Sequence, residues 1–254
     1  MKDEDLKLDF EKEMADIQIT SFDPKFNEDL SEKAFNNTIF ETIVNGRYAY
    51  FRTMIWAVNY FLGVKVYKWP TDLWIFQEIV WELKPDVWIE TGTYYGGGAW
   101  YIAHLFDGIN KGKVITIDKE KQENLPEHPR IQYISGDSVS EETIKQVNSI
   151  IGSARIDGTI VVNLDSDHMK DHVLKEMELY SPFVSDGSYM IVEDGILGHP
   201  VWVRDKQGKL LFPGPQEAIH EFLKTHKEFT IDKTKEKHLF TSNPNGYLRK
   251  NGKN

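Results

Sequence analysis

From residue 87 onward, short apolar segments alternate with segments of helical pattern. The apolar segments cover residues 87–90, 114–118, 131–137, 159–165 and 188–194. The helical segments lie near residues 97–107, 141–150, 169–180 and 216–226. Strands that are apolar throughout are buried on both faces, and strands that alternate with helices form parallel sheets covered by helices. The sequence therefore predicts an α/β fold with a Rossmann-like, doubly wound and mostly parallel sheet.

Two further segments flank this alternation. Residues 70–83 have the pattern of a helix, with Pro70 at the start and Pro85 beyond the end. Residues 238–250 predict two strands around an Asn-Pro-Asn-Gly turn.

The N-terminal part has a different character. Residues 1–16 have apolar side chains at helical spacing among many acids, and residues 30–62 are aromatic-rich and helical in pattern. We expect residues 1–62 to form an N-terminal helical arm that serves as an oligomerisation or lid region. Residues 63–254 would form the catalytic domain. Exposed aromatic residues on the arm would favour a homo-oligomer.

The charge and the residue types exclude several classes of function. The 254 residues include 30 basic and 40 acidic side chains, a net charge of −10, which argues against nucleic acid as a partner. The chain has no cysteine, so disulfides, thiolate metal sites and cysteine nucleophiles are excluded. No apolar segment is long enough to span a membrane, and the charged N-terminus does not resemble a secretory signal. We expect a cytoplasmic protein.

Acidic residues occur at the end of every predicted strand. In an open parallel sheet, ligands bind outside the carboxyl ends of the strands. The acids at these ends are Glu90, Asp118, Asp137, Asp165, Glu193 and Asp194. The sequence therefore predicts a binding site along this edge of the sheet.

The segment from Glu90 to Gly98 is a glycine-rich loop between a strand and a helix. Its Gly-x-x-x-Gly-Gly spacing differs from that of dinucleotide-binding folds, and a carboxylate at Glu90 suits a cationic ligand end better than a pyrophosphate. Asp118 ends the next strand, where an acid binds the ribose hydroxyls of a nucleoside. S-adenosylmethionine fits, with its adenine near Asp137 and Ser138. The expected cofactor contacts are Glu90, Thr91, Gly92, Thr93, Tyr95, Gly96, Gly97, Asp118, Asp137, Ser138 and Asp165. The alternative is a tight turn with a solvent-facing acid.

Asp165, Glu193 and Asp194 follow two strands that we expect to be neighbours. Their carboxylates would then converge, and converging carboxylates repel each other unless they share a proton or bind a cation. Oxygen ligands suit Mg²⁺, Ca²⁺ or Mn²⁺. His168 lies close enough in sequence to serve as a general base beside Asp165. The alternative reading of Asp165 is a helix cap.

Several segments together resemble the cephalosporin hydroxylase family, which includes bacterial rhamnosyl O-methyltransferases. They are residues 63–65, 69–78, 84–86, 90–98, 136–138, 164–168, 192–194, 214–215 and 243–248. The resemblance covers roughly residues 55–250. It implies a class I methyltransferase domain, a Mg²⁺ site on Asp165, Glu193 and Asp194, and His168 as the base. The chain departs from the family pattern at Gly98, where relatives often carry serine.

The resulting hypothesis is a Mg²⁺-dependent O-methyltransferase. It would transfer a methyl group from S-adenosylmethionine to a hydroxyl of a small-molecule acceptor, a sugar or a glycosylated natural product or glycolipid. Asp165 and His168 would be its catalytic residues. Three alternatives stay open: an Fe(II)-dependent hydroxylase with His199 as a second histidine ligand, an NAD-dependent oxidoreductase, and an inactive scaffold of the same fold.

Overall fold

The computed structural model describes residues 42–43, 45–47, 49–120, 122–153, 158–198 and 213–252. Residues 46–254 form one compact unit. The amphipathic segment predicted at residues 1–16 and the candidate ligand His199 both lie outside the described residues. The functional boundary expected at residue 62 stays a prediction.

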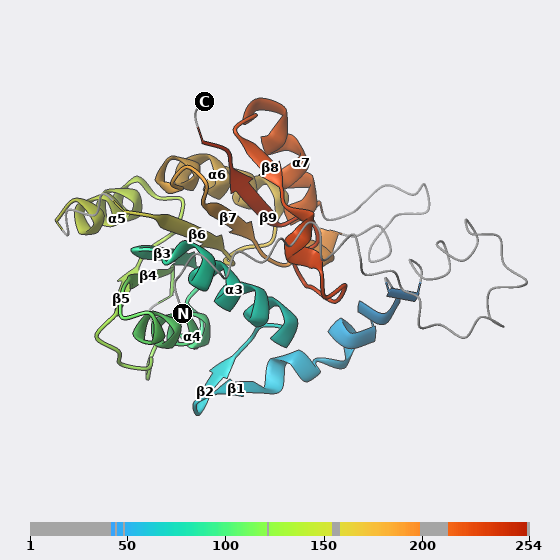
Figure 1. Cartoon of the computed structure of the whole chain (residues 1–254), viewed down its shortest axis with the longest axis horizontal. Coiled ribbons are helices and arrows are strands. Elements are labelled where there is room, and N and C mark those ends of the chain that lie inside the picture. Colours follow the sequence, from blue (N-terminus) through green and yellow to red (C-terminus); the bar gives the residue numbers. More distant parts are fainter. Residues whose placement is uncertain are drawn as a thin grey trace, which may run out of the picture. The chain divides into compact units, whose positions relative to one another are not determined.

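A mostly parallel sheet of seven strands forms the centre of the described residues (Figure 1). In spatial order the strands are β5 (Ile131–Ser135), β4 (Lys113–Asp118), β3 (Val87–Thr91), β6 (Ile160–Leu164), β7 (Tyr189–Val192), β9 (Tyr247–Lys250) and β8 (Phe229–Ile231). The first five are parallel, and β9 is antiparallel to both β7 and β8. All five strands predicted from the apolar segments are present. Since β3 is buried along its whole length, it lies at the centre of the fold.

Helices cover both faces of this sheet. They are α3 (Pro70–Leu83), α4 (Gly97–Gly108), α5 (Glu141–Ser153), α6 (Lys170–Tyr180) and α7 (Pro215–Thr225). On one face, Phe76 of α3 and Phe106 of α4 pack against the sheet. On the other, Val147 of α5, Met177 of α6 and Phe222 of α7 form a second core. The sheet is therefore doubly wound, as the alternation of segments predicts. A parallel sheet also excludes the jelly roll that the hydroxylase alternative requires.

The residues just before α3 differ from the expectation of a purely helical region. The described residues between 42 and 53 are helical, and Ile55–Val58 form a 3₁₀ helix. However, β1 (Asn59–Phe61) and β2 (Val64–Val66) form an antiparallel hairpin. Leu62 and Gly63 have φ angles of 46° and 83°, as a two-residue hairpin turn requires. The helical prediction is therefore wrong for residues 59–61.

The predicted pair of strands near the end of the sequence is half correct. β9 forms, but its partners are β7 and the unpredicted β8, and residues 237–246 form no strand. Thr241 and Ser242 in this segment donate hydrogen bonds to the buried carboxylate of Asp72. Because these polar groups bind the start of α3, the segment does not continue the sheet.

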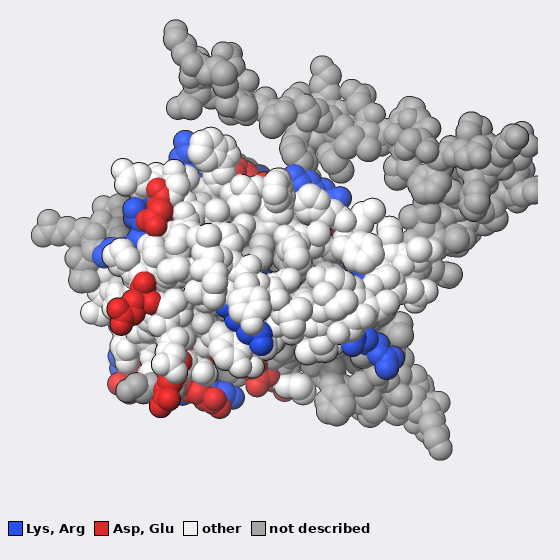
Figure 2. All heavy atoms as spheres, turned by 90° about the horizontal axis from the view of Figure 1, so that it is seen from below, with Lys and Arg blue, Asp and Glu red and all other residues white. Residues whose placement is uncertain are grey.

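Two expectations from the sequence concern a membrane-spanning helix and a nucleic-acid partner, both of which were expected to be absent. Within the described residues, no helix combines the length and the apolar character needed to cross a bilayer. On the face drawn in Figure 2, Lys and Arg side chains of the described residues are scattered rather than gathered into one basic patch. The absence of a nucleic-acid partner stays a prediction.

Candidate functional site

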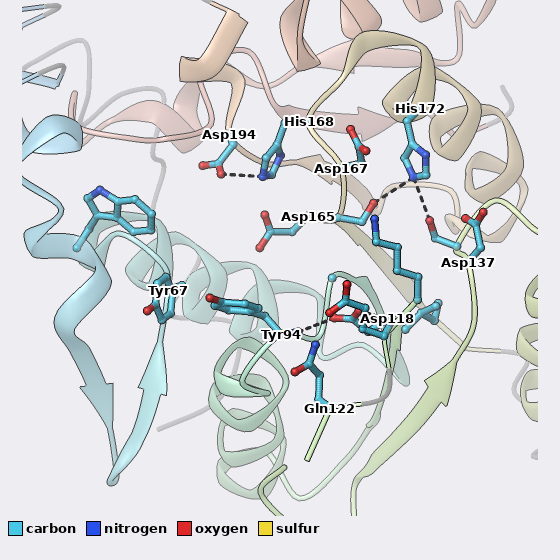
Figure 3. A pocket seen from close by; sticks show the side chains of 17 residues that line it. Tyr67, Tyr94, Asp118, Gln122, Asp137, Asp165, Asp167, His168, His172 and Asp194 are labelled. Carbon is cyan, nitrogen blue, oxygen red and sulfur yellow. Dashed lines mark hydrogen bonds and ion pairs between the residues drawn. The ribbon is translucent and has the colours of Figure 1, made fainter. Parts of the chain in front are cut away.

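A cavity of about 430 Å³ lies at the carboxyl ends of β3, β4, β5, β6 and β7 (Figure 3). It brings together predicted residues from five separate segments: Gly92, Asp118, Asp137, Ser138, Asp165, His168 and Asp194. A smaller cavity of about 30 Å³ adjoins it, lined by Glu90, Gly92, Thr93, Tyr95, Gly97 and Asp165 among others. Thr91, Gly96 and Glu193 line neither cavity. Most of the predicted site is therefore assembled along one edge of the sheet.

The glycine-rich loop brings β3 close to the end of β6. Gly92 has a φ of +86°, and a Cβ at this position would overlap the carbonyl oxygen of Asp165. The Asp165 backbone N–H donates to the Thr91 carbonyl oxygen at 3.1 Å. A larger residue at Gly92 would push these segments apart, so the loop composition sets the position of Asp165. Thr91 does not line the cavity, and its carbonyl and hydroxyl oxygens both accept from the Asp165 N–H.

Glu90 is a buried carboxylate beside the small cavity. Thr116 lies opposite it on β4 and donates a hydrogen bond to Glu90 Oε2 at 2.8 Å. Burial raises the pKa of Glu90 to about 7, although the nearby Lys68 ammonium opposes this rise. A buried carboxylate of this kind can accept hydrogen bonds from an ammonium group of a ligand.

Lys68, which the sequence reasoning missed, is the cation at the centre of the acidic groups. Its Nζ lies 2.7 Å from Asp165 Oδ2 and also contacts Glu193 Oε1. Burial alone would lower the pKa of Lys68, but the Asp165, Glu193 and Glu90 carboxylates raise it well above its usual value. Lys68 precedes α3 and lies 97 residues from Asp165 in the sequence, so no local pattern signals the pairing.

Backbone groups orient the two acids at the β4 and β5 ends. The Asp118 carboxylate accepts hydrogen bonds from the backbone N–H of Tyr94 at 2.8 Å and of Glu120 at 2.9 Å. Asp137 accepts from the Val139 N–H at 3.0 Å. Both side chains line the large cavity. The contact of Asp118 with a ribose and the contact of Asp137 with an adenine stay predictions.

Asp165, His168 and Asp194 form a group that could bind a metal ion. Each offers one ligand atom, and these atoms all lie within 4.8 Å of one another. Asp194 has a φ of +53° directly after β7, and its backbone N–H donates to Asn243 Oδ1 at 2.9 Å. Burial raises the pKa values of Asp165 and Asp194. Two half-buried carboxylates with an imidazole are oxygen-rich donors that fit a hard divalent cation.

Glu193, the third predicted ligand, lies elsewhere. It is buried, contacts Lys68, and accepts a hydrogen bond from Asn163 Nδ2 at 2.6 Å. Asp194 has a left-handed backbone, and the two successive carboxylates have different partners: Glu193 contacts Lys68, and Asp194 lies beside His168. Direct metal binding by Glu193 stays a prediction.

His168 is the histidine of the group. Its Nε2 lies 3.4 Å from Asp194 Oδ2, and about a third of its side chain is exposed to the cavity. Burial would lower the pKa of His168, but Asp194 and Asp165 raise it above its ordinary value. The imidazole can therefore accept a proton within reach of the carboxylates.

Aromatic side chains form another part of the cavity wall. Trp56 and Tyr67 have ring centroids 5.9 Å apart, and Tyr67 and Tyr94 lie 5.0 Å apart. Tyr67 and Tyr94 lie across the cavity from His168 and Asp194 in Figure 3. The clustering of tryptophans between Trp56 and Trp100 is the sequence signal, but packing is the simpler interpretation of such a cluster. Trp56 and Tyr67 were not predicted as site residues.

Known proteins of one family resemble this chain over most of its length. The family model described as Rhamnosyl O-methyltransferase/CmcI matches residues 53–251. The rhamnosyl O-methyltransferase of Mycobacterium tuberculosis is 34% identical over 212 residues, which are 80% of this chain and 82% of the relative. The Mycobacterium leprae enzyme of the same name is 33% identical over 205 residues, 78% of this chain and 86% of the relative.

Solved structures show the same fold. An apo structure of CmcI is 20% identical, with a TM-score of 0.58 over 78% of each chain. A CmcI structure with Mg and S-adenosylmethionine has the same TM-score and identity over 77% of this chain and 78% of the other. The resemblance inferred from the sequence is confirmed by the family match and the curated relatives. The chain therefore belongs to the rhamnosyl O-methyltransferase/CmcI family.

Proposed function

We propose that the protein transfers a methyl group from S-adenosylmethionine to a hydroxyl group of a sugar. The acceptor would be carried by a glycosylated natural product or a glycolipid. The observation that carries this proposal is that one cavity holds both the acids suited to the cofactor and the group Asp165, His168 and Asp194. Family membership supports it, since the mycobacterial relatives are rhamnosyl O-methyltransferases.

The cofactor would extend along the edge of the sheet. Its amino group would pair with Glu90 in the small cavity, its ribose hydroxyls with Asp118, and its adenine would lie near Asp137 and Ser138. Asp165 lines both cavities, so the reacting end of the cofactor would lie beside it. This order follows the order of β3, β4 and β5 in the sheet.

Asp165 and Asp194 would hold a Mg²⁺ ion, with Glu193 as a further predicted ligand. When bound, the ion would act as a Lewis acid that lowers the pKa of the acceptor hydroxyl. His168 would take the proton of that hydroxyl on its imidazole, and Asp194 would hold the protonated ring. Trp56, Tyr67 and Tyr94 would pack against the apolar face of the sugar.

Trp56 belongs to the proposed arm of residues 1–62, and the catalytic domain would comprise residues 63–254. Since Trp56 lines the cavity, this residue would contribute to the acceptor site, and a role of the arm as a lid or in oligomerisation remains part of the proposal. Assembly as a homo-oligomer and a cytoplasmic location remain part of this proposal.

The test is transfer of a labelled methyl group to a panel of rhamnosides, with Mg²⁺ or with EDTA. We expect transfer with Mg²⁺, a loss with EDTA, and a loss in Asp194→Asn. The matched control is Asp171→Asn, an exposed acid on α6 outside both cavities, which should keep full activity. Full transfer in EDTA would rule out the metal, and no transfer to any glycoside would favour the inactive scaffold.

A further inference from the structure

Glu176 on α6 is a buried carboxylate that the proposed reaction does not use. Its exposure is 0%, and its Oε1 accepts a hydrogen bond from Ser166 Oγ at 2.6 Å. Its Oε2 has no hydrogen-bond partner among the described residues. A buried carboxylate is costly unless a cation or a proton compensates it. One turn earlier on the same helix, His172 Nε2 lies 3.6 Å from Glu176 Oε1 and provides this partner.

His172 connects Glu176 to the large cavity. Its side chain lines that cavity and is 25% exposed. Its Nε2 lies 3.3 Å from Ser166 Oγ and 3.2 Å from Ser138 Oγ (Figure 3 shows His172 above Asp137). The Glu176 carboxylate raises the pKa of His172, and burial opposes that rise.

The direction of these hydrogen bonds follows from counting hydrogens. A serine hydroxyl has one hydrogen to donate. Ser166 donates its hydrogen to Glu176, so its oxygen can only accept from His172. Nε2 therefore carries a hydrogen and has no lone pair, so Ser138 Oγ cannot donate to it and keeps its own hydrogen free. Ser138 lines the cavity, so this hydrogen is available to a ligand there.

Asp137 adds an acceptor beside this donor. One of its oxygens accepts the Val139 N–H at 3.0 Å, and the other oxygen remains available in the cavity. A donor beside an acceptor matches the edge of adenine, where a ring nitrogen accepts and the amino group donates. Hypoxanthine has the reverse pattern, because its ring N–H donates and its carbonyl oxygen accepts.

We propose that His172, held by Glu176, orients the Ser138 hydroxyl as a donor and so makes the cavity select adenine over hypoxanthine. His172 and Glu176 are positioning residues in this scheme, and Ser138 contacts the base. The inference rests on the proposed function, since it assumes that a nucleoside cofactor occupies this cavity.

The experiment compares two ligands that differ only in the base. Calorimetry would measure the binding of S-adenosylhomocysteine and S-inosylhomocysteine to the full chain. We expect the wild-type protein to prefer the adenosyl compound at least about tenfold, as the loss of a buried hydrogen bond predicts. In Ser138→Ala and His172→Phe, the ratio of the two affinities should fall to less than about threefold.

His226 provides the matched control. It also pairs with a glutamate, since its Nε2 lies 3.3 Å from Glu178 Oε2, but it lines neither cavity. His226→Phe should therefore keep the wild-type ratio. Thermal melts would show whether each variant is folded. Glu176→Gln replaces His172→Phe if the latter does not fold, and it should lower the ratio in the same way.

The outcomes separate the inference from the proposed function. Wild-type protein that binds neither compound would overturn the proposed function, and this inference with it. Wild-type protein that binds both equally would overturn only the inference. The inference alone would also be overturned if the His172 and Glu176 variants kept the full preference for the adenosyl compound.

Discussion

The ammonium of Lys68 lies 2.7 Å from Oδ2 of Asp165, in a part of the structure where carboxylates predominate. Lys68 is the one basic side chain that is fully buried among the described residues, whereas Asp72, Glu90, Glu176 and Glu193 are all buried acids. Its ion pairs therefore compensate much of the charge at the carboxyl ends of β6 and β7.

Replacing Lys68 by methionine should strongly destabilise the protein. The substitution keeps the apolar stem but leaves Asp165 and Glu193 without their cation, and breaking a buried ion pair costs about 3–5 kcal/mol. Urea unfolding in a buffer free of divalent cations would measure the change in the free energy of unfolding. Lys65→Met, at a half-buried lysine above the Tyr67 ring, should have little effect because this lysine forms no ion pair with the buried acids of the described residues. Equal losses in both variants would contradict the assigned role of Lys68.

Replacing His168 by glutamine should lower kcat without weakening cofactor binding. A general base contributes typically about 10²–10⁴-fold to the rate, so a loss in this range is expected. Steady-state kinetics together with calorimetry of S-adenosylhomocysteine would separate the two effects. His104→Gln serves as the control, because His104 contacts the Trp100 carbonyl and lines neither cavity. An unchanged kcat in His168→Gln would remove the histidine from the mechanism.

Serine at Gly98 should be poorly tolerated in this chain. A Cβ there would overlap Glu90 Oε1 and would lie 2.8 Å from Lys68 Cε. Overpacking of this kind costs typically about 1–3 kcal/mol. Chemical unfolding of Gly98→Ser would measure the loss. Gly108→Ala in the same helix has no neighbour within 4 Å of the added carbon, so it should be neutral or stabilising. A fully stable Gly98→Ser would mean that Glu90 and Lys68 can shift.

Asp72 should give the stability a characteristic dependence on pH. Burial raises its pKa from 3.8 to about 6, although hydrogen bonds from Thr241, Ser242 and Tyr247 oppose this. The native state therefore holds the proton more tightly than the unfolded chain, so ionisation of Asp72 lowers stability as pH rises. The contribution lost between pH 4.5 and 7.5 is about 2 kcal/mol.

Comparison with Asp72→Asn isolates this contribution. The free energy of unfolding of the variant minus that of the wild type should become more positive by about 2 kcal/mol from pH 4.5 to pH 7.5. Other titrating groups cancel in the difference. A difference that is constant over this range would show that Asp72 ionises normally.

The strands and the location of the site could be predicted because both follow from short-range patterns. Apolar segments predict buried strands, and the acids at Asp118, Asp137 and Asp165 must then lie at one edge of the sheet. The hairpin of β1 and β2 could not be found in the same way. Its Tyr60 and Phe61 are aromatic in a region rich in aromatics, and the turn residue Leu62 carries no sign of its positive φ.

The side chains that contact the site residues could not be predicted from the sequence, because they come from distant parts of the chain. Lys68, Asn243 and His172 act on residues that come from other elements, and such pairings depend on how helices and loops pack rather than on spacing. The separate roles of Glu193 and Asp194 coincide with one left-handed residue after β7. Asp72 reads as a first-turn helix acid in the sequence, yet it anchors residues 241–242.

The position of β9 has a consequence for how the protein matures. β9 follows every other strand of the sheet in the sequence but lies between β7 and β8, and the segment before it supplies Asn243 to Asp194. During synthesis, all the carboxylates of the site leave the ribosome before their last structural support does. A nascent chain that has reached only Asp194 therefore lacks Asn243, which accepts the Asp194 N–H, and it also lacks the strand that covers β7.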